Sequence, residues 1–117
     1  MAKILVVDDN FPDLETMKEI LEGNKHEVAI ATNGAQAIDL AHSIDYDLFI
    51  VDVKMPTLSG YDMVQLLREK HKGNAKIIFV SIVPKQEVTM GGVDGFIQKP
   101  FTPDDFMEQI KSVLGEK

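Results

Sequence analysis

The chain has 117 residues, a formal net charge of −7 and no cysteine. This length suits one compact domain with its own core, so we expect residues 1–117 to fold as a single domain. The missing cysteines exclude a disulfide framework and a thiolate metal site. The negative charge argues against nonspecific binding to nucleic acid, which depends on clustered Lys and Arg.

The apolar segments are too short to span a membrane. The N-terminal apolar run covers only residues 4–7 before Asp8 interrupts it, which is too short for the core of a signal peptide. We therefore expect a soluble, cytoplasmic protein that binds neither a membrane nor nucleic acid directly.

Apolar runs of strand length alternate with segments of helical periodicity along the whole chain. This pattern is typical of repeated strand–helix–strand units around a parallel sheet, and it predicts five strands and five helices. The strands are expected at residues 4–7, 28–31, 48–51, 77–80 and 96–98. The helices are expected at residues 12–21, 35–43 and 61–70, within 84–94, and from 103 onward.

Local signals mark where the later helices begin and end. Gly73-Asn74 is expected to end the third helix. The last helix has a clear start, because Thr102 can cap it and Pro103 fits its first position. The segment 84–94 holds Gly91-Gly92 and allows at most about two helical turns, so the fourth helix is expected to be short or irregular.

Polar side chains follow four of the apolar runs. An acidic pair follows the first, an aspartate the third, a serine the fourth and a lysine the fifth: Asp8, Asp9, Asp52, Ser81 and Lys99. In an open parallel sheet, ligands bind outside the carboxyl ends of the strands. The sequence therefore predicts a site with three carboxylates, a hydroxyl and an ammonium.

Each of these residues also has a simpler interpretation when it is taken alone. Asp8 and Asp9 are suited to capping the first helix, and Asp52 to forming a turn. Ser81 is compatible with a structural hydroxyl, and an isolated lysine such as Lys99 is usually solvated. The joint occurrence of all five at strand ends favours a shared site.

The ordered set of motifs resembles the receiver domains of two-component response regulators over essentially the whole chain. The resemblance rests on the acidic pair, Asp52 with Met55-Pro56 after it, Gly60, Ser81 and Lys99-Pro100-Phe101. It implies an α/β, flavodoxin-like, doubly wound fold. The parallel sheet would have five strands in the order 2-1-3-4-5 with helices on both faces, and no output domain is expected in this chain.

The resemblance also implies a role for each acidic residue. Asp52 would accept a phosphoryl group from the phosphohistidine of a sensor histidine kinase or phosphotransfer protein, forming an acyl phosphate. Clustered carboxylates repel one another, so a divalent cation would be needed to keep them ionised together. Mg²⁺, or another divalent cation such as Mn²⁺, would bind Asp9 and Asp52 directly, Asp8 mainly through water, and the backbone carbonyl of Lys54.

The remaining positions are assigned to phosphoryl binding and signalling by the same resemblance. Lys99 would pair with one phosphoryl oxygen and Ser81 would donate a hydrogen bond to another. Ser81 would then move toward the phosphoryl group while Phe96 swings into the vacated space, which changes the surface offered to an unknown downstream protein. An aromatic residue in a strand also suits a purely structural core position.

Two features depart from the family pattern. Ser81 and Lys99 are only 18 positions apart, and the shortage falls on the fourth helix. Lys54 stands two residues after Asp52, beside the path of an attacking water.

The residues leave three classes of function open. The leading one is a phosphorylatable signalling module, with phosphotransfer onto itself and its own dephosphorylation as its only reactions. The shortened fourth helix also suits a binding module that works without phosphorylation. A phosphatase acting on a diffusible substrate is disfavoured, because Lys54 stands where a second acid would be required.

Overall fold

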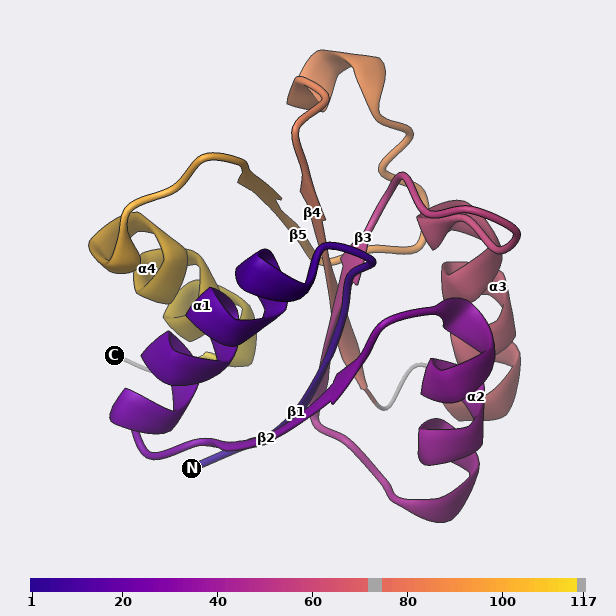
Figure 1. Ribbon diagram of the computed structural model, residues 1–117, viewed down its shortest axis with the longest axis horizontal. Helices are drawn as coiled ribbons and strands as arrows, with labels where there is room; N and C mark the ends of the chain where they lie inside the picture. The colour runs from indigo at the N-terminus through magenta and orange to yellow at the C-terminus, as the bar shows by residue number, and fades with distance from the viewer. Residues whose placement is uncertain (72–74, 116–117) are drawn as a thin grey trace.

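The computed structural model describes residues 1–71 and 75–115, and its centre is a sheet of five parallel strands (Figure 1). The strand order is β2-β1-β3-β4-β5, which confirms the predicted topology. The strands are β1 (Lys3–Val7), β2 (Glu27–Ala31), β3 (Leu48–Asp52), β4 (Lys76–Ser81) and β5 (Gly95–Gln98). The helices are α1 (Phe11–Gly23), α2 (Gly34–Ser43), α3 (Gly60–His71) and α4 (Pro103–Leu114), with a 3-10 turn, η1, at Lys85–Glu87.

Helices cover both faces of the sheet, with α1 and α4 on one face and α2 and α3 on the other (Figure 1). Alternate residues of each strand enter different cores. Phe49 and Phe79 belong to the core under α2 and α3, whereas Ile50 and Ile78 belong to the core under α1 and α4. Burial on both faces explains why the central strands are continuous apolar runs and do not alternate between apolar and polar residues.

Helices α1 and α4 begin at short polar side chains that accept hydrogen bonds from backbone N–H groups of the first turn. The Asn10 side chain accepts a hydrogen bond from the backbone N–H of Asp13 at 3.0 Å, so Asn10 caps α1. Thr102 caps α4 in the same way, as predicted, and accepts from the N–H of Asp105 at 3.1 Å. Asp8 and Asp9 therefore remain outside the helix cap.

The segment between β4 and β5 is the main correction to the predicted elements. Five α-helices are expected from the sequence, but the described part of the chain contains four, and residues 82–94 form only the turn η1. The expectation of a short or irregular element in this place is confirmed. Pro84 and the glycine pair prevent a longer helix, and Gly92 adopts a positive φ of 82°.

The elements around this correction agree with the predicted positions to within a few residues. The stop signal expected for α3 at Gly73-Asn74 lies outside the described residues. Within residues 1–71 and 75–115, no helix is both long and apolar enough to cross a membrane.

Candidate functional site

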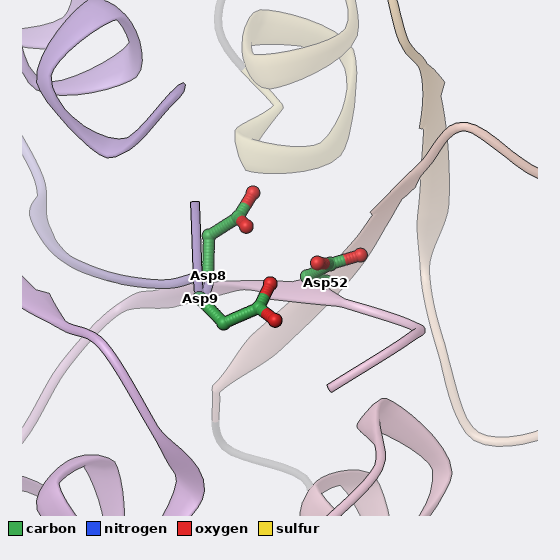
Figure 2. A group of neighbouring side chains, drawn as sticks. All are labelled: Asp8, Asp9 and Asp52. Carbon is green, nitrogen blue, oxygen red and sulfur yellow. The ribbon is translucent and has the colours of Figure 1, made fainter. Parts of the chain in front are cut away.

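The carboxyl ends of β1 and β3 bring three acidic side chains together (Figure 2). Asp8 directly follows β1 and is fully buried, Asp52 is the last residue of β3 and is also buried, and Asp9 is exposed. Each residue offers one carboxylate oxygen, and these three oxygens lie within 4.8 Å of one another. The pairing of β1 with β3 in the sheet places these chain segments side by side.

Lys99 follows β5 and inserts its side chain into the same site. Its Nζ lies 2.6 Å from Oδ2 of Asp8 and 2.8 Å from Oδ2 of Asp13. The Lys99 side chain is only 9% exposed, so its interpretation as a solvated surface lysine is wrong. These two contacts engage two of the three N–H donors of the ammonium, which leaves one donor for a further anion.

Ser81 ends β4 and is fully buried. Its Oγ accepts a hydrogen bond from the backbone N–H of Val83 at 2.9 Å, which leaves the hydroxyl hydrogen available for another acceptor. The backbone N–H of Lys99 donates to the Ser81 carbonyl at 2.8 Å, so the fourth and fifth strand ends are joined beside the site.

The loop after β3 approaches the site through its backbone. The backbone N–H of Lys54 lies 3.3 Å from Oδ1 of Asp52, while the Lys54 side chain is exposed. Gly60 begins α3 against this loop, and a Cβ added there would lie 2.5 Å from the Asp52 carbonyl oxygen. Only glycine permits such a close approach, which gives a physical reason for Gly60 in the motif.

A cavity of about 510 Å³ lies beside the loop that comes after β3. Its lining includes Lys54 and Tyr61 from the chain after β3, and Val83 and Glu87 from the segment between β4 and β5. Phe96 is partly buried and packs against the core under α2 and α3, as do Val83 and Met90 of the β4–β5 segment. The position predicted for a switching aromatic therefore lies against that core, on the same face as residues of the segment that forms η1 in place of a helix.

Burial and charge shift the pKa values at the site. Burial raises the pKa of Asp52 to about 7, and the negative charge of Asp8 adds to this rise, while Lys99 only partly opposes it. Burial alone would lower the pKa of Lys99, but hydrogen bonds to Asp13 and Asp8 outweigh it and raise the pKa of the ammonium. At neutral pH, Asp52 therefore needs additional positive charge to be fully ionised.

The three carboxylates fit a hard divalent cation. Oxygen ligands suit Mg²⁺ and Mn²⁺, and a cation held by Asp8, Asp9 and Asp52 would offset the repulsion that raises the pKa of Asp52. Asp8 is already engaged through both oxygens, because Oδ1 accepts from the N–H of Asn10 at 2.9 Å and Oδ2 from Lys99. The donor set is thus compatible with a divalent cation, with Asp9 the most open ligand.

Two residues at the site were not found from the sequence. Asp13 lies in the first turn of α1 and contacts Lys99, and its only signal is a carboxylate one turn after the acidic pair. Gln98 donates from Nε2 to the carbonyls of Ser81 and Ile82, both at 3.0 Å, and to that of Lys99 at 3.2 Å. No local sequence pattern indicates that a glutamine will connect two strand ends.

Known proteins are similar to this chain in sequence and in fold. The polar-differentiation response regulator DivK of Brucella anthropi is 27% identical, and the match covers 97% of this chain and 96% of that protein. The structure of TrrA from Thermotoga maritima, a response regulator in complex with Mg²⁺-BeF, has a TM-score of 0.88 and 34% identity, with 97% and 99% of the two chains covered. The chemotaxis protein CheY4 of Vibrio cholerae has a TM-score of 0.89 and 29% identity, with 97% and 98% covered.

A family model matches most of the chain. Residues 4–111 match the response regulator receiver domain, a range that includes β2 to β5, all of β1 except Lys3, and the residues that surround the site. The chain therefore belongs to the response regulator receiver domain family of two-component signalling proteins.

Proposed function

We propose that this receiver domain signals through phosphorylation of Asp52. The observation that carries the proposal is the arrangement around the Asp52 carboxylate, which lies among two other acidic side chains and near a buried ammonium. Phosphoryl transfer requires a positioned nucleophile and positive charge around the transferred group. The site supplies the nucleophile, the oxygen ligands for a cation and the ammonium.

In the proposed reaction, a carboxylate oxygen of Asp52 attacks the phosphorus of a phosphohistidine on a sensor histidine kinase or phosphotransfer protein. The P–O bond to Asp52 forms while the P–N bond breaks, and the histidine leaves with the bonding electron pair and takes up a proton. Bound Mg²⁺ would supply positive charge to the phosphoryl oxygens. Lys99 donates to one of these oxygens, and the free hydroxyl hydrogen of Ser81 reaches another.

The cation would be held by the residues at the ends of β1 and β3. Asp9 and Asp52 are proposed as direct ligands, with the backbone carbonyl of Lys54 as the third contribution from the protein. Asp8 acts mainly through water, which agrees with the hydrogen bonds that already engage its two oxygens. The Mg²⁺-BeF complex of the related TrrA supports this choice of cation.

Signalling to a downstream protein is proposed to begin at Ser81 and Phe96. If the Ser81 hydroxyl turns toward the phosphoryl group, the hydrogen bond from the Val83 N–H is strained or lost, and the start of the 82–94 segment is free to move. Phe96 packs near this segment and would respond to its movement. Binding of a partner to the moved segment would then favour the phosphorylated state.

A second candidate function is favoured by the turn η1 in place of a helix. Side chains of α3 already hold residues 82–94, because Tyr61 accepts from the N–H of Thr89 at 3.1 Å and Arg68 donates to the Gly92 carbonyl. A segment fixed in this way suits a binding module that works without phosphorylation. Equal partner affinity with and without a phosphodonor would support this alternative.

Intact mass spectrometry after incubation with acetyl phosphate and Mg²⁺ tests the leading proposal. The wild type should gain a single phosphate adduct, and the Asp52→Asn variant should gain none, because it lacks the carboxylate nucleophile. Omission of Mg²⁺ with added EDTA should also prevent the adduct. An adduct of equal yield on Asp52→Asn would refute Asp52 as the acceptor.

A further inference from the structure

The Lys99 ammonium is already occupied by two carboxylates. An ammonium has three N–H donors, and two of those on Lys99 point to Asp8 at 2.6 Å and Asp13 at 2.8 Å. The two acceptors differ in environment, because the Asp8 side chain is 0% exposed and that of Asp13 is 38% exposed. The contact with Asp13 is therefore the weaker of the two and the easier to exchange.

Asp13 is held opposite Lys99 by the start of α1. Its backbone N–H donates to the Asn10 cap at 3.0 Å, which fixes the first turn of the helix. A carboxylate in this turn is also favoured by the helix dipole. Among the described residues, the acidic group close enough to share a cation consists of Asp8, Asp9 and Asp52 and does not include Asp13. Asp13 therefore acts on the ammonium rather than on the cation.

Asp13 and an incoming phosphoryl group would compete for the Lys99 ammonium. Both are anionic acceptors for the same ammonium, and the negative charge of Asp13 also repels the phosphoryl oxygens. Only one donor of Lys99 is left while both carboxylates are bound. Release of Asp13 frees a second donor and removes one of the two carboxylates that offset the positive charge of Lys99.

We propose that Asp13 holds Lys99 in the unphosphorylated protein and competes with the phosphoryl group for its ammonium, which limits how readily Asp52 is phosphorylated. This inference rests on the proposed function of Asp52. Asp13 is a positioning residue in this scheme, because it acts through Lys99 and forms no bond to the reacting atoms.

The test compares the initial rates of phosphate uptake from acetyl phosphate with Mg²⁺ for wild type, Asp13→Asn and Glu15→Gln. Asp13→Asn should be phosphorylated about three- to fivefold faster, the range expected for loss of a partly exposed ion pair. Glu15→Gln removes the same charge from an exposed position of the same helix and should keep the wild-type rate. Urea unfolding of all three proteins shows whether the folded fraction is the same.

A second readout examines Lys99 itself. In ¹⁵N-labelled protein without a phosphodonor, the hydrogens of the Lys99 ammonium should exchange with water faster in Asp13→Asn than in wild type or Glu15→Gln. A change in helix stability alone would alter urea unfolding and leave this exchange rate unchanged, because the exchange reports loss of the Lys99–Asp13 contact itself.

The outcomes separate this inference from the proposed function. A faster rate together with faster ammonium exchange in Asp13→Asn alone supports the competition. A rate equal to or below that of wild type overturns it, as does a faster rate with unchanged exchange or the same acceleration in Glu15→Gln. If wild type gains no adduct at all, the proposed function fails and the inference fails with it.

Discussion

The two sides of the candidate site are held in place by different means. At the ends of β1 and β3, which we term the acidic side, the backbone and buried charged groups determine the geometry around Asp52. Residues 82–94, which we term the β4–β5 loop, are held by side chains that reach across from α3, chiefly Arg68 and Tyr61. The acidic side thus depends on close backbone packing, whereas the β4–β5 loop depends on a few polar contacts and on apolar side chains, such as Val83 and Met90, that pack against the core under α2 and α3.

This difference predicts that phosphorylation at the acidic side and opening of the β4–β5 loop respond to different substitutions. Strand pairing places Asp52 beside Val80 of β4, and the backbone N–H of Lys99 donates to the Ser81 carbonyl, so backbone contacts outside the β4–β5 loop hold both residues. The loop retains few regular backbone hydrogen bonds of its own, and segments of this kind open more readily than strands. Changes to the acidic side should therefore affect stability and phosphorylation together, whereas changes to the loop contacts should affect stability and loop opening but leave phosphorylation unchanged.

The largest effect is expected from Gly60→Ala, which tests the close packing of the acidic side. A Cβ at this position would lie 2.5 Å from the Asp52 carbonyl oxygen and 2.7 Å from the Cα of Val53. Both are backbone atoms, which cannot move away without disturbing β3 and the loop after it. We expect a loss of about 3 kcal/mol in the free energy of unfolding, measured by urea denaturation, and slower phosphate uptake. Gly23→Ala is the control, since a Cβ there meets nothing within 4 Å. Equal stability of the two variants would contradict the argument.

The next effect concerns the buried charge of Asp52. Its pKa rises from 3.8 to about 7 in the folded protein, so between these pH values the folded state binds more protons than the unfolded state. Stability contributed by protonated Asp52 is therefore lost as pH rises through this window. Without Mg²⁺, Asp52→Asn should be more stable than wild type by about 2 kcal/mol at pH 8, because asparagine carries no buried charge. The difference stays below the value that the pKa shift alone would give, since surrounding groups relax around the ionised carboxylate.

Urea denaturation of both proteins at pH 5 and pH 8 checks this prediction. The advantage of Asp52→Asn should grow between the two pH values, and added Mg²⁺ should reduce it at pH 8 by binding the ionised wild-type site. A stability difference that does not change with pH would show that the Asp52 carboxylate has its ordinary pKa.

Most of the acidic side can be predicted from the sequence, because strand ends and turn residues are local signals. Asp8, Asp9 and Asp52 come after apolar runs, and a parallel sheet brings those ends together once the strand order is known. The contact between Asp13 and Lys99 could not be predicted in the same way. It joins residues 86 positions apart and depends on how α1 sits against the end of β5.

The β4–β5 loop shows the opposite case. Proline and the glycine pair predict that a long helix is absent, but they do not say what replaces it. Arg68 and Tyr61 hold the loop from α3, and both residues fit an ordinary exposed face of an amphipathic helix when only the sequence is known. Most of their partners are backbone groups, whose positions are not encoded in any side-chain pattern.

Arg68→Lys tests whether the β4–β5 loop depends on contacts from α3. The guanidinium donates to the carbonyls of Gly92 and Ala75 and to the Asp94 carboxylate, at distances from 2.7 to 2.9 Å. A lysine keeps the charge but cannot reproduce this fork, so we expect a loss of about 1 to 2 kcal/mol in the free energy of unfolding. Amide hydrogen exchange should rise in residues 82–94, while the rate of phosphate uptake stays at the wild-type value.

Glu69→Gln is the matched control for this variant, since Glu69 is the exposed neighbour on the same helix. It should leave both exchange and stability unchanged. If Arg68→Lys slows phosphate uptake as strongly as Gly60→Ala, the two sides of the site are coupled and the proposed separation is wrong.

The smallest effect is expected from Lys54→Ala, at the border between the acidic side and the β4–β5 loop. The exposed Lys54 side chain comes two residues after Asp52 and lines the cavity that Val83 also borders. We expect it to lie beside the path of a water molecule that attacks an acyl phosphate on Asp52. Loss of this screen should accelerate hydrolysis of phosphorylated Asp52 by about two- to fivefold, the size expected for an exposed charge. The decay of the phosphate adduct, followed by intact mass after removal of the donor, measures this rate.

Lys76→Ala is the control, because Lys76 is exposed at the opposite end of β4 and its substitution should leave the decay unchanged. An equal decay rate in wild type and Lys54→Ala would mean that residue 54 acts at the site only through its backbone and that its side chain does not screen the acyl phosphate.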